Sequence, residues 1–407
     1  MIAADGLNGA DRGRREGGRT GWTSGRRGAM LRRKPGRERG AEMGWHERMR
    51  GAVLGALAAC AVASAGAAAT ADPPPGVAQA VPAAGAPPAV CAGADLMQSM
   101  PAETRARIDA AVAATPYAQG TRFTARKGDA RIEIIGTYHF DDPRHDPMVA
   151  ALTPVIASAD AMLVEAGPDE EKRLTAALAR DPSLMVDTEG PTLPERLGDE
   201  TWRELGEAMS ARGMPPVMVS RLRPWYVSMM LGISPCMMGQ IKARGDTAGL
   251  DHRLMQVAAD AGVPVRALEP WDTVLTLFDG MSDAEELDMI RAALPAARLA
   301  DDYATTTIEA FFRGDIWAIW EFGRLDAYDH AGMDRLSVDR QVQLAEDRLM
   351  TGRNRGWIAP LTEAASAAAA RGKPVVAAFG ALHLPGEDGV LRLLERDGWT
   401  ITAGGAS

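Results

Sequence analysis

The sequence predicts an α/β fold with a mostly parallel central sheet and a large helical region in the middle of the chain. Short apolar runs alternate with segments of helical spacing, which is the βαβα order of parallel sheets. Two of these runs stop at the same phrase, Gly-x-x-His, at 136–139 and 380–383. Ligands of open α/β sheets sit outside the carboxyl ends of strands. We therefore expect His139 and His383 to share one strand-end site.

The individual elements follow from apolar periodicity and from the residues that interrupt it. Runs of four to six residues rich in Val, Ile, Leu and Ala predict buried strands at 132–135, 161–165, 264–269 and 374–379, with a short last strand at 399–402. Apolar residues three or four apart predict helices at 96–114, 147–158, 170–179, 200–211, 216–231, 251–261, 283–294, 305–313, 317–327, 334–350, 354–371 and 389–396. Pro224 should break or kink the helix over 216–231.

The N-terminal 71 residues are predicted to be an over-extended gene start followed by a secretory signal. Residues 1–42 are rich in Arg and Gly, and Met43 precedes a basic stretch and an apolar, Ala-rich run over 51–69. Cleavage after Ala71 would give a soluble periplasmic protein, whereas the sequence over 57–60 resembles a bacterial lipoprotein box that would lipidate Cys60. Export to the periplasm, or to the outer membrane as a lipoprotein, is therefore expected.

The remaining chain divides into a linker and one large domain. Residues 72–90 are rich in Pro and Ala and are interpreted as a linker, and 91–407 as a single domain. Removing 1–71, which holds 13 of the 45 basic and 6 of the 54 acidic residues, leaves a net charge of −16. Scattered basic residues in an acidic protein disfavour nucleic acid as a partner. Contact with a membrane is expected only through the signal or a lipid anchor.

Two cysteines remain outside the leader, Cys91 and Cys236. In an exported chain, two cysteines favour one disulfide, which would join the start of the domain to its middle. The alternative is two separate buried thiols.

Candidate metal ligands and catalytic groups occur at the predicted strand ends. Glu165 and Glu269 each end an apolar run, so both should emerge at the same sheet edge as His139 and His383. Two imidazoles and one or two carboxylates suit a divalent cation such as Zn²⁺, Mn²⁺ or Co²⁺. A carboxylate that binds no metal could act as general base for an attacking water. The alternative is that the glutamates cap loops or pair with arginines.

Three further residues are candidates with open alternatives. Asp251 precedes a predicted helix and is either its N-cap or an acidic metal ligand. Arg353 and Asn354 lie at the start of a late helix and either contact the substrate or a developing oxyanion, or are a surface charge and a helix cap. His145 is expected to be peripheral, and His252, next to Asp251 on a helix, should point elsewhere.

These motifs, in this order, resemble the TraB/GumN family (TraB/PrgY/GumN). The resemblance rests on Gly136 to His139, the strand ending at Glu165, and the motifs at 223–225, 249–251, 268–269, 353–354 and 380–384, with Gly386 and Gly389. It covers nearly all of the predicted mature chain. The family includes a protein linked to exopolysaccharide gene clusters, a pheromone-shutdown protein, and animal TIKI proteins described as metal-dependent proteases.

The resemblance implies an exported metal-dependent hydrolase, with a peptide or protein as substrate. The two histidines and the strand-end glutamates would then be metal-binding or catalytic. More distantly, the chain resembles the haem-binding and erythromycin-esterase-like superfamily, which makes haem the alternative cofactor. The alternative functions are a haem- or metal-binding envelope protein without enzymatic activity and an accessory factor for exopolysaccharide assembly.

Overall fold

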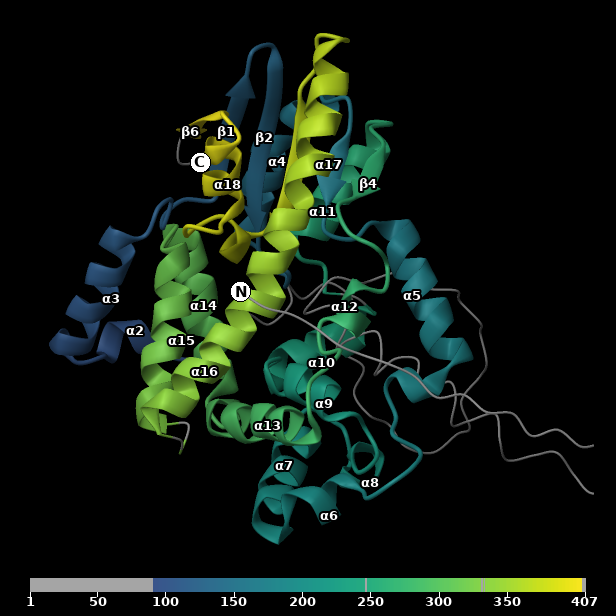
Figure 1. The fold of residues 1–407 in the computed structure, drawn as a ribbon, viewed down its shortest axis with the longest axis vertical. Helices are drawn as coiled ribbons and strands as arrows, with labels where there is room; N and C mark the ends of the chain where they lie inside the picture. The colour runs from purple at the N-terminus through teal and green to yellow at the C-terminus, as the bar shows by residue number, and fades with distance from the viewer. Residues whose placement is uncertain (1–90, 246, 331, 333, 405–407) are drawn as a thin grey trace, which may run out of the picture. The chain divides into compact units, whose positions relative to one another are not determined.

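The computed structural model describes residues 91–245, 247–330, 332 and 334–404. The predicted leader over 1–71, including Cys60, and the predicted linker over 72–90 lie outside the described residues. The described part is an α/β structure with a mixed six-stranded sheet in the order β4-β3-β5-β2-β1-β6 (Figure 1). The strands are β1 (Arg122–Lys127), β2 (Ala130–Thr137), β3 (Met162–Val164), β4 (Val265–Ala267), β5 (Val375–Gly380) and β6 (Thr400–Ala403).

The four strands that precede the candidate residues are parallel, as predicted. β2 and β3 flank β5, and β4 pairs with β3. The sheet is nevertheless mixed, because β1 is antiparallel to both β2 and β6. β1 was not predicted. Its two buried side chains, Phe123 and Ala125, are too few to distinguish it from a loop by apolar periodicity.

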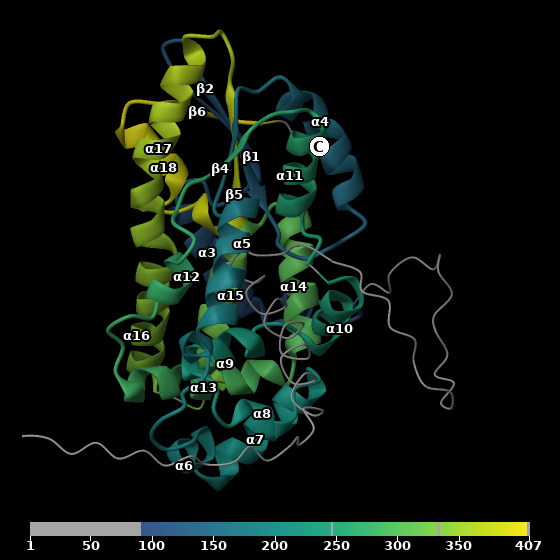
Figure 2. The ribbon, with the colours of Figure 1, turned by 90° about the vertical axis from the view of Figure 1, so that its right-hand side faces the viewer.

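Helices cover both faces of the sheet (Figure 2). On one face lie α4 (His145–Ala157) and α11 (Leu250–Asp260), and on the other lie α17 (Gly352–Ala369) and α18 (Val390–Arg396). Alternate residues of β2 serve the two faces: Ile134 packs in the core with α17 and α18, and Ile135 in the core with α4 and α11. The continuous apolar strands are therefore buried on both sides, as parallel strands usually are.

The other helices gather largely beyond the sheet edge where β5 leads into the 3₁₀ turn η4 (Ala381–His383) (Figure 1). Pro224 is the first residue of α9 (Pro224–Leu231), so the helix predicted over 216–231 is broken there, and Pro101 divides the helix predicted over 96–114. The helices that do not cover the faces of the sheet are α2 (Leu96–Ser99), α3 (Ala102–Ala114), α5 (Pro168–Arg180), η2 (Pro182–Leu184), α6 (Leu193–Leu197), α7 (Asp199–Ala211), α8 (Pro216–Val219), α9 (Pro224–Leu231), α10 (Pro235–Arg244), α12 (Thr273–Thr276), α13 (Asp283–Ala297), α14 (Ala300–Arg313), α15 (Ile316–His330) and α16 (Arg335–Glu346).

A π-helical turn joins α16 to α17. This turn, η3 (Asp347–Thr351), has right-handed helical backbone at both junctions, so one uninterrupted helix runs from α16 into the sheet layer. Single π turns inside α-helices are frequent at functional sites. Here the turn ends two residues before Arg353, which with Asn354 is a candidate from the sequence.

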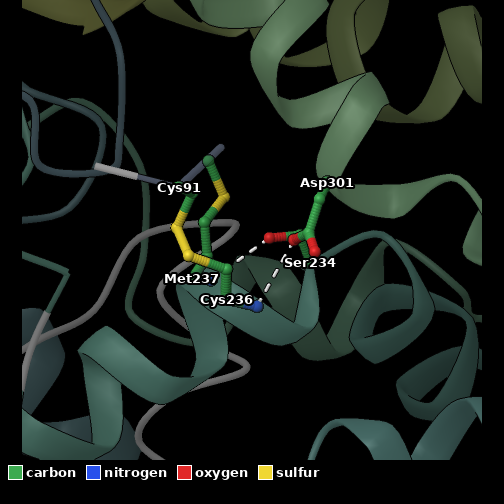
Figure 3. The surroundings of a disulfide bond; sticks show 5 residues. All are labelled: Cys91, Ser234, Cys236, Met237 and Asp301. Atoms are coloured by element: carbon green, nitrogen blue, oxygen red, sulfur yellow. Dashed lines mark hydrogen bonds between the residues drawn. A yellow bond between two sulfur atoms is a disulfide. The ribbon is translucent and has the colours of Figure 1, made fainter. Parts of the chain in front are cut away.

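The predicted disulfide between Cys91 and Cys236 is present, with the two Cα atoms 5.6 Å apart (Figure 3). Cys236 lies in the first turn of α10, where Ser234 is the N-cap and accepts a hydrogen bond from the N–H of Met237. The N–H of Cys236 donates to Asp301 of α14 at 3.4 Å. The bond therefore fastens the start of the described chain to the helical region.

Candidate functional site

The four parallel strands bring the predicted side chains to one edge of the sheet. β2 ends two residues before His139, β3 one residue before Glu165, and β4 two residues before Glu269. β5 ends at Gly380 and passes directly into η4, which carries His383. The carboxyl ends of parallel strands point the same way, so residues far apart in the sequence meet here.

Gly380 lies between three of these side chains. A Cβ atom at this position would be 3.1 Å from Nε2 of His139, 3.2 Å from Oε1 of Glu165 and 3.5 Å from Cδ2 of His383. The N–H of Gly380 donates to Oε1 of Glu165 at 2.6 Å, and this oxygen lies 4.0 Å from Nε2 of His383. Glycine thus leaves a small space into which an imidazole nitrogen and a carboxylate oxygen both point.

Arg353 joins the two strand-end glutamates. Its Nη2 donates to Glu165 at 2.6 Å and to Glu269 at 2.7 Å, and its Nε donates to the other oxygen of Glu269 at 2.9 Å. The three side chains are at most 10% exposed. The glutamates do pair with an arginine, which was the alternative to a role as metal ligands or catalytic groups, and the alternative of Arg353 as a surface charge is wrong. Arg353 compensates two buried carboxylates.

The two carboxyl groups have opposite pKa shifts. Burial acts to raise the pKa of Glu165, but Arg353, His383, His139 and the N–H of Gly380 outweigh it and hold that pKa well below its ordinary value. Burial raises the pKa of Glu269, and Arg353 offsets this only in part. Environments that separate the pKa values of neighbouring carboxyls are typical of sites where one group stays ionised and the other exchanges a proton.

Asn354 fixes the ring of His383. Its Oδ1 lies 2.6 Å from Nδ1 of the imidazole, and its Nδ2 donates to the carbonyl of Asp388 at 2.9 Å. Because an amide oxygen only accepts, Nδ1 must carry the proton and Nε2 must be bare. Burial lowers the pKa of His383 to about 3, so the ring is neutral. Asn354 lies within α17 and is 2% exposed, so the helix-cap alternative for it is wrong.

Asp251 lies beside the ring of His139 but makes no hydrogen bond to it. Nδ1 of His139 lies 3.4 Å from Oδ1 of Asp251, while Nε2 faces Gly380. Burial acts to lower the pKa of His139, but the charges of Asp251 and Glu165 raise it above its ordinary value. The N-cap of α11 is Gly249, and Asp251 lies inside its first turn, so the N-cap alternative for Asp251 is wrong. A side chain at Gly249 would collide with the backbone of His139.

A small cavity of about 10 Å³ adjoins these residues, lined in part by Thr137, His139, Glu165, Glu171 and Asp251. Three buried atoms of its lining find no hydrogen-bond partner within the described ranges: Oγ1 of Thr137, Nδ1 of His139 and Oδ1 of Asp251. Buried polar atoms normally have partners. The space suits roughly one water molecule or one small ion.

Sequence reasoning missed two residues that border this site. His252 was expected to point elsewhere, yet its Nδ1 lies 3.4 Å from Oδ2 of Asp251 and its Nε2 lies 3.1 Å from Glu171. The two oxygens of the Asp251 carboxylate reach both histidines, which spacing along a helix does not reveal. Glu171 is 2% exposed although it follows two acidic residues in the first turn of α5, a pattern that indicates a solvated helix start.

The donor atoms of the site are of the kinds that bind a divalent cation, but they are too far apart in this structure to coordinate one together. No group of three or more His, Cys, Asp or Glu lies close enough to hold a metal among residues 91–245, 247–330, 332 and 334–404. However, Nε2 of His139 faces Gly380 beside Glu165, and Nε2 of His383 lies 4.0 Å from Glu165 and 3.4 Å from Arg353. Nδ1 of each ring faces an oxygen atom, that of Asn354 at 2.6 Å for His383 and that of Asp251 at 3.4 Å for His139. Metal-ligating histidines almost always show this arrangement. The space at Gly380 and the unpartnered oxygen atoms of Thr137 and Asp251 agree with a small cationic ligand.

His145 gives a pH prediction outside this site. It is fully buried between Tyr138, Phe311 and Phe312, and neither ring nitrogen has a hydrogen-bond partner in the described part of the chain. Burial lowers its pKa to about 4. The unfolded chain, with an ordinary pKa of about 6.5, then binds a proton first, so stability is lost as pH falls from about 6.5 towards 4.

Replacing His145 by phenylalanine should reduce this acid sensitivity. We expect the free energy of unfolding to fall by about 2 kcal/mol less between pH 7.0 and 4.5 in His145→Phe than in the wild type. Chemical denaturation at both pH values measures it. An unchanged pH dependence in His145→Phe would contradict the prediction.

One comparison with known proteins, that with family models, agrees with the resemblance seen in the sequence. A sequence model of the TraB/PrgY/gumN family matches residues 121–403, which is more than half of the 407 residues and spans β1 to β6. No curated protein and no solved structure matches the chain. The matched region includes His139, Glu165, Glu269, Arg353 and His383. The chain therefore belongs to the TraB/PrgY/gumN family.

Proposed function

We propose that the protein is an exported metal-dependent hydrolase that acts on peptides or proteins. One observation carries the proposal: His139 and His383, far apart in the sequence, each have Nδ1 facing an oxygen atom and Nε2 near the Glu165 carboxylate, where Nε2 of His383 also lies 3.4 Å from Arg353. Two imidazoles and a carboxylate form a common donor set for Zn²⁺, Mn²⁺ or Co²⁺. A bound cation would polarise the scissile carbonyl group and make the attacking water more acidic.

Each of the other residues at the site has a distinct role in the proposed reaction. Glu165, whose pKa is lowered, stays ionised and suits a ligand position beside the histidines. Glu269, whose pKa is raised, is the better group for exchanging a proton with the reacting water. Arg353 holds both carboxylates, and Asn354 keeps Nε2 of His383 bare. Asp251 faces Nδ1 of His139, so we now assign it to orienting that ring rather than to binding the metal.

A small cation fits the site better than haem does. The cavity beside His139 has room for roughly one water molecule, so a porphyrin would not fit without rearrangement of the surrounding side chains. Nε2 of His383 lies 3.4 Å from the guanidinium of Arg353, and the imidazole packs against Trp357 with ring centres 4.5 Å apart. Binding of a haem iron to Nε2 of His383 would require Arg353 and Trp357 to move away from this ring.

Metal binding without catalysis is the second candidate function. It is favoured by the ion pairs of Arg353, which hold both Glu165 and Glu269 and leave neither carboxylate unpaired. Hydrolysis of a broad peptide library by the metal-loaded protein would distinguish the two functions. In the enzymatic case the library is cleaved, and a chelator abolishes the cleavage.

Export is supported by the disulfide, because such bonds persist in oxidising compartments. Among the described residues no helix combines the length and apolar character that crossing a membrane requires. The leader and the lipid-anchor candidate Cys60 lie outside the described residues. Fractionation of cells that produce the full chain, with and without Cys60→Ser, would separate a soluble periplasmic protein from a lipoprotein.

The test of the metal site uses protein purified without a histidine tag. Elemental analysis should find about one divalent metal ion per wild-type chain, and His139→Ala or His383→Ala should lose most of it because each removes one ligand of a two-histidine set. The control His330→Ala, at an exposed histidine of α15, should retain the metal. Full metal content and activity in both site variants would show that the proposal is wrong.

A further inference from the structure

A row of carboxylates and imidazoles leads from helix α5 to the site. Oε1 of Glu171 lies 3.1 Å from Nε2 of His252, and Nδ1 of His252 lies 3.4 Å from Oδ2 of Asp251. The other oxygen of Asp251 lies 3.4 Å from Nδ1 of His139. Acid and imidazole therefore alternate, and the row ends at Nε2 of His139 beside Gly380 and Glu165.

The row is too well buried to be a surface ion-pair network. The side chain of Glu171 is 3% exposed, that of Asp251 13% and that of His252 16%. Taking a carboxylate out of water costs free energy unless it is paired, and each carboxylate of the row meets an imidazole. Glu171 and Asp251 also line the same cavity as His139 and Glu165, so the row and the strand-end site are contiguous.

The link between Asp251 and His139 needs support from its far side. At 3.4 Å the two groups are not hydrogen-bonded, and both facing atoms find no other partner among the described residues. The orientation of the Asp251 carboxylate consequently depends on the group at its other oxygen, which is His252. Glu171 in turn holds the opposite edge of the His252 ring, and Thr247 lies 3.4 Å from Nδ1 of that ring.

We propose that Glu171 and His252 are positioning residues, which hold Asp251 so that the proton of His139 stays on Nδ1 and Nε2 remains free for a ligand. What Nε2 binds rests on the proposed function. The position of the proton is a property of the metal-free protein and can be tested without it. Mutation of a residue that holds a metal ligand in place typically weakens metal binding about 10- to 100-fold.

The test compares charge-matched variants of the full protein. Glu171→Gln and Asp169→Asn each remove one negative charge from the first turn of α5, but Asp169 is exposed. His252→Phe is matched by His330→Phe, at an exposed histidine. Each protein is labelled with ¹⁵N-histidine and freed of metal, and the tautomer of His139 is read from ¹⁵N–¹H correlations at pH 8.5, with His139→Gln used for assignment.

We expect the Nδ1–H tautomer of His139 in the wild type and in both controls. Glu171→Gln and His252→Phe should shift His139 towards Nε2–H and weaken Zn²⁺ binding, measured by calorimetry, about 10- to 100-fold. If one of these two variants does not fold, the other is compared with its own control and tests the inference alone. An Nε2–H tautomer in the wild type, or an unchanged tautomer in the folded variants, would overturn the inference. Failure of the wild type to bind Zn²⁺ would instead count against the proposed function alone.

Discussion

Arg353→Met is expected to destabilise the protein by about 3–5 kcal/mol at pH 7.5, the range found when one partner of a buried ion pair is removed. Glu165 and Glu269 would then lie close together without their shared cation, both at most 10% exposed. The guanidinium of Arg353 also lies 5.2 Å from the centre of the Trp357 ring, a cation–π contact that methionine cannot replace, so the loss is mainly electrostatic. Chemical denaturation of the variant and the wild type measures it.

The pH dependence separates this electrostatic effect from a packing defect. Without Arg353 the pKa values of both buried carboxyls should rise above their unfolded values, so the stability deficit should shrink as pH falls from 7.5 to 5. Arg355→Met is the matched control. Arg355 lies on the same helix, is 61% exposed and pairs with Asp388 at 3.0 Å, so its loss should cost less than about 1 kcal/mol. Equal stability of the two variants would contradict the role given to Arg353.

The strand-end placement of the site could be predicted because it depends on short-range patterns. A buried apolar run followed by Gly-x-x-His or by Glu identifies both a strand and the residue at its carboxyl end. Parallel topology then brings those ends together. The same reasoning found the disulfide, because only two cysteines remained to pair in a domain that the sequence predicts to be exported.

The ion pairs within the site could not be predicted from the same patterns. Arg353 reaches the glutamates because α16, η3 and α17 form one helix that passes the sheet edge, and no local signal marks the π turn. Long-range packing likewise buries Glu171, which a solvated first helical turn would expose. Pairings of this kind depend on where whole helices dock, which the sequence of each helix does not specify.

Gly380→Ala should abolish metal binding while leaving the protein folded. The backbone of Gly380 has a φ of −48°, which alanine adopts readily. Its methyl group would lie 3.1 Å from Nε2 of His139 and 3.2 Å from Oε1 of Glu165, in the space where the proposed ligands converge. These contacts are tight but need only small shifts, so we expect the free energy of unfolding to fall by about 1–2 kcal/mol. Affinity for Zn²⁺ should fall at least about 100-fold, because displaced ligands lose more than displaced outer partners do.

Gly356→Ala on α17 provides the comparison for a methyl group added away from the site. Apart from the neighbouring helix backbone, no atom of the described residues lies within 4 Å of a Cβ added at Gly356. Alanine is also the better helix former at this position. This variant should bind Zn²⁺ as the wild type does and be equally or slightly more stable. Calorimetric titration of the metal-free proteins, with denaturation curves for each, tests both expectations. Because a single methyl group separates Gly380→Ala from the wild type, retained Zn²⁺ affinity in a folded variant would mean that the cation binds elsewhere. The convergence of His139, Glu165 and His383 on Gly380 would then belong to the packing of the sheet edge alone.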